Sequence, residues 1–362
     1  MRVGRDSRST SAPPQAWHQS TGFPFSSTAW HWLQIRSIPK SLPDRFAGIQ
    51  RQPCRRQLAP PQVAGTLEGM HPPVRLVAID VDGTLLPGFA KALTPRTGRA
   101  LKSAQEAGII VALATGRRTD FAAPLLQGLN LRADLPLIAS NGAVLRTLGG
   151  EILDRCLLPA QVARGLCEVF RPFGALVFTF DRPGSRELVL EDLEVAHKAI
   201  AMWVEANRDA IEVVKPLEDA LRDGEDLIQG MGAGSLSQMN LAEEALKASP
   251  WSGSCECVRT VYPGRDMSIL DLLPKGVSKG RALERLAARL GVDREETMAI
   301  GDNWNDVGML EWAGQGVLMG NAAAELHAMA EERGWQQTLP NDQDGVAVVL
   351  EDAIAKRAAD RI

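Results

Sequence analysis

Short apolar segments that end in a polar residue recur along the chain and alternate with segments of helical period. The apolar segments lie at residues 74–79, 109–114, 137–139, 297–300 and 316–319. The helical patterns lie at residues 94–107, 279–290 and 307–313. Continuous apolar runs between amphipathic helices are typical of parallel strands that are buried on both faces. The sequence therefore predicts an α/β fold with a doubly wound, mostly parallel sheet.

This alternation is interrupted between about residue 150 and residue 265. Strand-like runs lie here at residues 175–180, 187–190, 226–230 and 256–262, and helical patterns at 195–206 and 236–248. The mixture indicates an α+β insertion within one α/β domain. We therefore predict an N-terminal extension over residues 1–70, an α/β core over 71–150 and 265–362, and an inserted domain over 151–264.

The first 70 residues differ in composition from the rest of the chain. They are rich in Pro, Ser and Arg, show no helical or strand period, and hold nine Arg or Lys against three acidic residues. We predict a disordered extension, with a targeting segment or a partner-binding arm as alternatives and Met70 as a candidate native start. Because the whole chain has a net charge of −4, the remainder is acidic. We expect no binding to nucleic acid, since this balance gives no general attraction to it.

The composition also bears on the compartment. No stretch of about 18 uncharged apolar residues is present, so we expect no membrane-spanning helix. The five cysteines are an odd number in a long chain that shows no clean secretory signal. We interpret them as reduced thiols in a cytoplasmic protein. Cys255 and Cys257 lack a second pair of ligands at zinc-site spacing, so we expect no metal there.

Two carboxylates, Asp80 and Asp82, follow the first apolar segment, and Gly83 comes directly after them. In open α/β sheets, ligands bind beyond the carboxyl ends of the strands. Two carboxylates are costly to hold there unless a cation or a substrate compensates their charge. We expect the two side chains to point in opposite directions, so that one can face a metal while the other reaches a leaving group. An Asp-rich turn without chemistry is the alternative for this segment.

A hydroxyl and an open amide follow the second apolar segment, at Thr115 and Gly116, with Arg117 next. Both groups can donate hydrogen bonds to a phosphoryl oxygen, although Thr-Gly at the end of a strand is often only a turn. Lys279 begins a predicted helix, where a cation is unfavourable, and so indicates an anionic partner. A solvated lysine is the alternative.

More oxygen ligands follow the apolar segment at residues 297–300. Asp302 and Asp306 are four residues apart, with Asn305 beside them and Trp304 between. Carboxylate oxygens in this number suit Mg²⁺, whereas the alternative is an acidic helix start. We expect Trp304 to pack rather than to stack on a substrate, Trp203 to pack its helix, and the glycine-rich residues 230–234 to form a flexible turn.

The segments Asp-x-Asp-Gly-Thr (80–84), Thr115, Lys279 and Gly-Asp-x-x-Asn-Asp (301–306) occur here in an order that resembles the haloacid dehalogenase-like phosphatases. The similarity is greatest to Cof-type class IIB members, in Thr-Gly-Arg (115–117), Ser-Asn-Gly (140–142), Gly-Val-Ser-Lys-Gly (276–280), Met-Gly-Asn-Ala (319–322) and Asp-Gly-Val-Ala (344–347). The resemblance covers about residues 74–355. It implies a Rossmann-like core and makes the insertion a cap that sets substrate specificity.

The resemblance also implies a magnesium-dependent phosphatase of small phosphorylated metabolites. Asp80 would become an aspartyl phosphate, and Asp82 would serve as general acid and then base. Asp80, the Asp82 carbonyl, Asp302 and, through water, Asp306 would hold Mg²⁺. The groups expected to bind the phosphate or the substrate are Thr115, Gly116, Arg117, Asn141, Lys279 and Asn305.

Several substrates and two other functions remain open at this point. Sugar phosphates, nucleotides, flavin mononucleotide and pyridoxal phosphate all fit the predicted chemistry. A phosphosugar mutase would use the same intermediate but retain its product. A regulatory protein that accepts a phosphoryl group on Asp80 without turnover is the third possibility, although such a protein would not need the acid Asp82.

Overall fold

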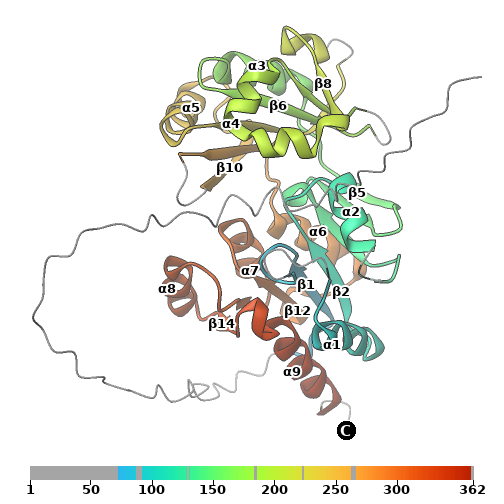
Figure 1. Ribbon diagram of the computed structural model, residues 1–362. Coiled ribbons are helices and arrows are strands. Elements are labelled where there is room, and N and C mark those ends of the chain that lie inside the picture. The colour runs from blue at the N-terminus through green and yellow to red at the C-terminus, as the bar shows by residue number, and fades with distance from the viewer. Residues whose placement is uncertain are drawn as a thin grey trace, which may run out of the picture.

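The computed structural model describes residues 72–86, 92–127, 129, 131–182, 186–221, 224–261 and 266–359. The predicted extension over residues 1–70 lies outside the described residues. Within the described part, no helix is both long and apolar enough to cross a membrane. The described elements form two sheets with their helices, a core and an inserted cap (Figure 1).

The core sheet has eight strands in the order β14-β13-β12-β1-β2-β3-β4-β5. The parallel strands are β1 (Leu76–Asp80), β2 (Ile110–Ala114), β3 (Pro136–Ala139), β12 (Thr297–Gly301), β13 (Gln315–Leu318) and β14 (Gln336–Gln337). Antiparallel pairing then adds β4 (Val144–Thr147) and β5 (Ile152–Arg155) at one edge. Since β1 lies between β12 and β2, the first predicted strand is central. The mostly parallel sheet is confirmed.

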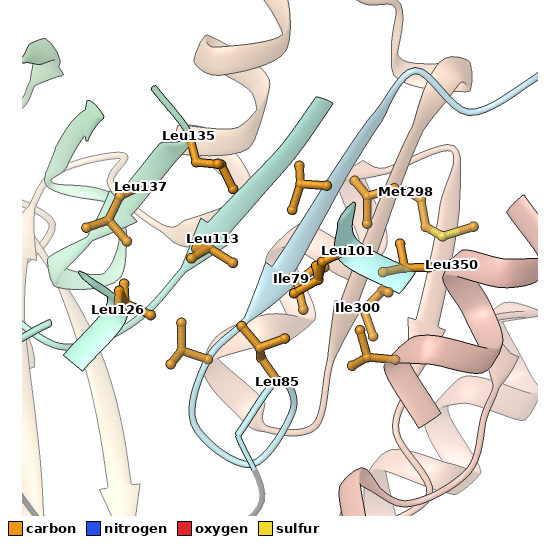
Figure 2. Packing of buried hydrophobic residues seen from close by; sticks show 14 of the residues in the cluster. Ile79, Leu85, Leu101, Leu113, Leu126, Leu135, Leu137, Met298, Ile300 and Leu350 are labelled. Atoms are coloured by element: carbon orange, nitrogen blue, oxygen red, sulfur yellow. The ribbon is translucent and has the colours of Figure 1, made fainter. Parts of the chain in front are cut away.

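Helices cover both faces of the core sheet. One face carries α1 (Pro95–Glu106), α2 (Thr119–Gln127) and α9 (Gly345–Ala359), and the other carries α6 (Lys279–Leu290), α7 (Val307–Trp312) and α8 (Ala324–Arg333). Side chains along β1 alternate between the two faces of the sheet: Ile79 packs with the first group of helices, and Ala78 packs with the second. Figure 2 shows the first group, where Leu101, Leu126 and Leu350 gather over the strands. This arrangement confirms the doubly wound fold.

Capping side chains fix the helix that carries the predicted lysine. The hydroxyl of Ser278 accepts a hydrogen bond from the backbone N–H of Arg281 at the start of α6. Gly291, at φ 63°, ends the helix in the left-handed conformation that glycine adopts at low cost. The lysine at position 279 is therefore held at the first turn of a helix with defined ends.

The cap sheet has six strands in the order β10-β11-β9-β6-β7-β8. They are β6 (Ala175–Phe180), β7 (Leu188–Leu190), β8 (Ile211–Val213), β9 (Leu227–Gly234), β10 (Cys255–Val261) and β11 (Ser268–Pro274). All neighbours pair antiparallel except β7 and β8. One face packs against α3 (Ala160–Phe170) and α5 (Leu236–Ala248), and the other against α4 (Leu193–Ala206), where Trp203 packs as expected.

The strands of the two sheets place both connections between the core and the cap later in the sequence than predicted. β5 ends at Arg155 within the core sheet, whereas the sequence suggested a crossing after residue 150. β11 belongs to the cap sheet and ends at Pro274, ten residues beyond the suggested return at 264. We propose that the core and the cap are separate domains joined at these two points.

The glycine-rich residues 230–234 are not a flexible turn. They form the second half of β9 and are buried, with strand partners on β6 and β11. A Cβ at Gly232 would lie 2.6 Å from the Phe170 ring, so glycine here allows α3 to pack close to the sheet.

Candidate active site

The carboxyl ends of four neighbouring parallel strands meet at one edge of the core sheet. Asp80 is the last residue of β1, Thr115 follows β2, Asn141 follows β3 in a short 3-10 turn, and Asp302 follows β12. Parallel strands place their carboxyl ends on the same side, which is where α/β sheets bind ligands. The topology therefore brings together predicted site residues that are more than 200 positions apart in sequence.

A buried lysine joins two of these segments. The Nζ atom of Lys279 lies 2.6 Å from Oδ1 of Asp80 and 2.6 Å from Oδ1 of Asp306. All three residues are buried, and a buried ammonium group needs such partners to remain charged. Burial opposes its charge, but Asp306 and Asp80 outweigh that effect and raise the Lys279 pKa above its ordinary value. The cation at the start of α6 thus has anionic partners, as predicted.

The lysine does not balance all of the negative charge around it. Carboxylate oxygens of Asp80, Asp302 and Asp306 lie within 4.8 Å of one another. Burial, followed by repulsion from Asp306, raises the pKa of Asp80 well above its usual value and that of Asp302 to about 7. Three carboxylates beside one ammonium leave an excess of negative charge, and such a site fits a divalent cation with oxygen ligands.

Hydrogen bonds orient the two carboxylates that follow β12. Oδ2 of Asp306 accepts the backbone N–H groups of Asp302 and Asn303, at 3.1 and 3.0 Å. The hydroxyl of Thr84 donates to Oδ1 of Asp302 at 2.8 Å. Both oxygens of Asp306 thus already accept hydrogen bonds from protein donors, whereas Asp302 keeps more capacity to bind another group.

The turn after β1 depends on Gly83. Its φ is 90°, and a Cβ there would lie 2.4 Å from Oδ2 of Asp302. The side-chain amides of Asn321 and Asn341 donate to its carbonyl oxygen, at 2.9 and 2.7 Å. This glycine therefore lets the β1 turn and the Asp302 carboxylate approach each other closely.

The second carboxylate of the β1 turn has different partners from the first. Arg117 donates to Asp82 through Nε at 2.8 Å and through Nη2 at 2.5 Å. The hydroxyl of Thr115 lies 3.4 Å from the same carboxylate. Asp80 faces Lys279 and Asp82 faces Arg117, so the two side chains diverge as expected. The cause is the turn that begins directly after β1, because residues two apart on an extended strand would lie on the same face.

Two side-chain amides, from Asn305 and Asn141, also lie at this edge of the core sheet. Nδ2 of Asn305 donates to Oδ1 of Asn141 at 3.2 Å, which links the β12 and β3 ends. A Cβ at Gly116 would lie 3.1 Å from Oδ1 of Asn141, so glycine keeps this space open. Every predicted site residue therefore has a contact that joins it to this edge. Their catalytic roles stay predictions.

Some participants were not predicted from the sequence. Thr84, Asn321 and Asn341 support the site through hydrogen bonds. The motif similarities included Thr84 and Asn321 but gave neither of them a role, and nothing in the sequence pointed to Asn341. Trp304 was expected to pack, but it is 50% exposed, so that expectation is wrong. The indole lies on a short turn whose neighbours serve the site, which leaves it no core to enter.

A contact between the core and the cap was also not predicted. Arg118, next to the residue that holds Asp82, is paired with Glu187 of the cap. Its Nη2 also donates to Oδ1 of Asn207, just after α4, at 2.9 Å. Glu187 and Asn207 are buried, so this contact ties the cap directly to the rim of the site.

Comparison with known proteins decides the family. A family model described as haloacid dehalogenase-like hydrolase matches residues 77–350. The chain belongs to this family. The recognition made from the motifs is confirmed, as are the fold and the enzyme class of phosphoric monoester hydrolase.

Two of the curated proteins that this chain resembles are named phosphatases. The 5-amino-6-(5-phospho-D-ribitylamino)uracil phosphatase YwtE of Bacillus subtilis is 27% identical over 303 residues, which cover 79% of this chain and all of that protein. The HMP-PP phosphatase of Serratia proteamaculans is 30% identical over 257 residues, which cover 70% of this chain and 87% of that protein.

Solved structures share the same architecture. A haloacid dehalogenase-like hydrolase from Bacteroides thetaiotaomicron has a TM-score of 0.63 at 27% identity, covering 77% of this chain and 99% of that one. The subclass IIB sugar phosphatase BT4131 has a TM-score of 0.59 at 23% identity, covering 77% and 98%. This likeness supports the fold of core and cap together.

Proposed function

We propose that this hydrolase is a magnesium-dependent phosphatase of small phosphorylated metabolites that works through an aspartyl phosphate on Asp80. The observation that carries the proposal is the buried Lys279, which bridges Asp80 and Asp306 beside a third carboxylate, Asp302. The relatives described above act on phosphorylated metabolites, which supports a substrate of this class.

The residues present fit a bound Mg²⁺. The Asp80 and Asp302 carboxylates and the backbone carbonyl of Asp82 would hold it directly, and Asp306 would support it, since protein donors already occupy its oxygens. When bound, the ion would reduce the repulsion between the nucleophile and the phosphate. This assignment also accounts for the excess of negative charge.

The side chains of this chain then divide the reaction into two displacements. A carboxylate oxygen of Asp80 attacks phosphorus, the bond from phosphorus to the leaving oxygen breaks, and Asp82 gives that oxygen a proton. Asp82 next takes a proton from water, the water oxygen attacks phosphorus, and inorganic phosphate leaves Asp80 as a free carboxylate. Arg117, which donates two hydrogen bonds to Asp82, would orient it for this role.

Three donors would bind the phosphoryl oxygens as charge develops. They are the hydroxyl of Thr115, the ammonium of Lys279 and the amide of Asn305. Donors that are fixed in advance stabilise a transition state without reorganising, and loss of one costs about 10²–10³ in rate.

The variant Asp80→Asn tests this function. With p-nitrophenyl phosphate and Mg²⁺, we expect turnover to fall by about 10³-fold or more, because an amide is a poor nucleophile. The exposed Asp209→Asn in the cap is the matched control and should keep full activity. Chelation by EDTA should abolish wild-type turnover, and added Mg²⁺ should restore it.

Three results would contradict the proposal. Retained turnover in Asp80→Asn would show that Asp80 is not the nucleophile. A requirement for a bisphosphate activator, without release of inorganic phosphate, would indicate a mutase. A stable phosphoprotein with negligible steady-state hydrolysis would indicate a phospho-acceptor protein.

A further inference from the structure

The face of the cap sheet that carries Asp271 packs against α4 around Ile269 and Met231, and against the core beyond Asp271. Leu273 lies two residues after Asp271 on β11, and Val258 lies on the neighbouring strand β10. Both pack in the same hydrophobic cluster as Val277 and Val144 of the core. Val258 pairs in register with Asp271, and paired residues share a face. Figure 1 likewise places β10 on the core side of the cap and α3 on the far side.

Asp271 is an ionisable group whose carboxylate has no partner among the described residues. The other six residues of β11 are buried, and Asp271 alone is partly exposed, although β11 lies between β10 and β9 inside the sheet. Within the described part of the chain, its carboxylate makes no hydrogen bond or ion pair. Burial raises its pKa to about 7. A central strand thus carries a partly exposed carboxylate on this face of the sheet.

Gln229 is a second unpartnered acceptor on the same face. It lies on β9, two residues before Met231, the strand partner of Asp271, so both side chains project from the same side of the sheet. The residue is 8% exposed, and its Oε1 atom is buried without a hydrogen-bond partner among the described residues. Thr179 of β6 pairs with it in register and is buried as well.

An orphaned buried acceptor costs about 1–3 kcal/mol unless a ligand or water supplies a donor. Two acceptors on adjacent strands therefore select a group that carries N–H or O–H donors, and the carboxylate favours a cationic one. A ligand carboxylate at the same place would meet Asp271 as a like charge and would be rejected.

We propose that Asp271 and Gln229 form the subsite for the leaving group, and that this group carries an amine or amino nitrogen at its end far from the phosphate. This inference rests on the proposed function, because it concerns the substrate of that same site. Asp271 and Gln229 act in recognition, and the reacting atoms stay with Asp80 and Asp82.

The test compares inhibitors that differ at the end far from phosphorus. Glucosamine 6-phosphate, glucose 6-phosphate and 6-phosphogluconate are assayed as competitors of p-nitrophenyl phosphate hydrolysis at pH 8, where Asp271 is mostly ionised. The wild-type chain should bind the amino compound at least about tenfold more tightly than the acid, the discrimination expected of one charged hydrogen bond. The neutral sugar should fall between them.

Asp271→Asn should reduce this ratio to about twofold or less, and Gln229→Leu should weaken the amino compound selectively. Neither change should alter turnover of p-nitrophenyl phosphate by more than about twofold, since its leaving group offers no donors. Glu244→Gln, which removes an exposed carboxylate on the outer helix α5, is the matched control and should keep the wild-type ratio.

The inference is overturned if the wild-type ratio is near one, if neither competitor binds at millimolar concentration, or if Asp271→Asn leaves the ratio unchanged. Equal losses with every compound would show a structural role only. These outcomes are distinct from failure of the proposed function, which would appear as no Mg²⁺-dependent hydrolysis of p-nitrophenyl phosphate by the wild-type chain.

Discussion

At the scale of single residues, position relative to a strand end predicts more of the site than residue type does. Asp80, Thr115 and Asp302 could be placed together because each follows an apolar run, and parallel strands end at one edge. Asn321 and Asn341 could not, because they bind the carbonyl of Gly83 from loops whose path depends on the whole fold. Local sequence carries no signal for such a contact.

The clearest prediction at the scale of single residues concerns Gly83. Gly83→Ala should lower the free energy of unfolding by about 1–2 kcal/mol through its left-handed backbone alone, and more through the clash with Asp302. The Mg²⁺ concentration needed for half activity should rise, because Asp302 must move. Urea unfolding and Mg²⁺ titration of activity measure the two effects.

Gly98→Ala provides the matched control. Gly98 lies within α1, and no atom is within 4 Å of its added Cβ. This change should stabilise the chain by about 0.5–1 kcal/mol and leave the Mg²⁺ requirement unchanged. A Gly83→Ala variant that behaves like Gly98→Ala would contradict the role assigned to the turn.

At the scale of elements, periodicity located the strands and helices that carry the site but not those that frame it. The α6 range, residues 279–290, and the β6 range, residues 175–180, match the expected ranges. The strands β5 and β11 were among the elements that were not predicted, as were the helices α2, α3, α8 and α9. β5 has no apolar run, and its residues are partly or fully exposed. The Gly-rich half of β9 was mistaken for a turn because glycine marks both turns and close approaches.

The contact of Arg118 with Glu187 and Asn207 predicts coupling between two parts of the chain. Arg118→Met or Glu187→Gln alone should each cost about 3 kcal/mol of unfolding free energy, because each leaves a buried polar partner unmatched. The double variant should cost clearly less than the sum. A double-mutant cycle with urea unfolding measures this coupling.

The exposed pair Arg208 and Glu205 serves as the control cycle. Its side chains are 62% and 52% exposed, so its coupling should stay at about 0.5 kcal/mol or below. Additive costs for Arg118 and Glu187 would mean that the cap is docked by apolar packing alone.

At the scale of the whole molecule, the acidic site links stability to pH and to metal. Burial raises the pKa of Asp302 from 3.8 to about 7, so between these values the folded chain binds more protons than the unfolded chain. The free energy of unfolding that Asp302 contributes therefore falls as pH rises through this window. In EDTA, Asp302→Asn should gain stability relative to wild type from about pH 4 to about pH 7.

Mg²⁺ should reverse this difference above pH 7. It binds the ionised carboxylates of the folded state and so stabilises wild type but not Asp302→Asn. Thermal unfolding of both proteins, with EDTA and with Mg²⁺ across pH 5–8, checks both signs. Equal melting temperatures of the two proteins at every pH in EDTA would contradict a buried Asp302 carboxyl group with a raised pKa.

The bridge made by Lys279 also has a consequence for biosynthesis. Its partner Asp80 precedes it by 199 positions, and β1 is completed on one side by β12, which is made later still. A nascent polypeptide that has emerged only as far as the cap holds the proposed nucleophile, Asp80, without the ammonium of Lys279 or the Asp302 and Asp306 carboxylates. Translation must therefore run almost to its end before the catalyst exists.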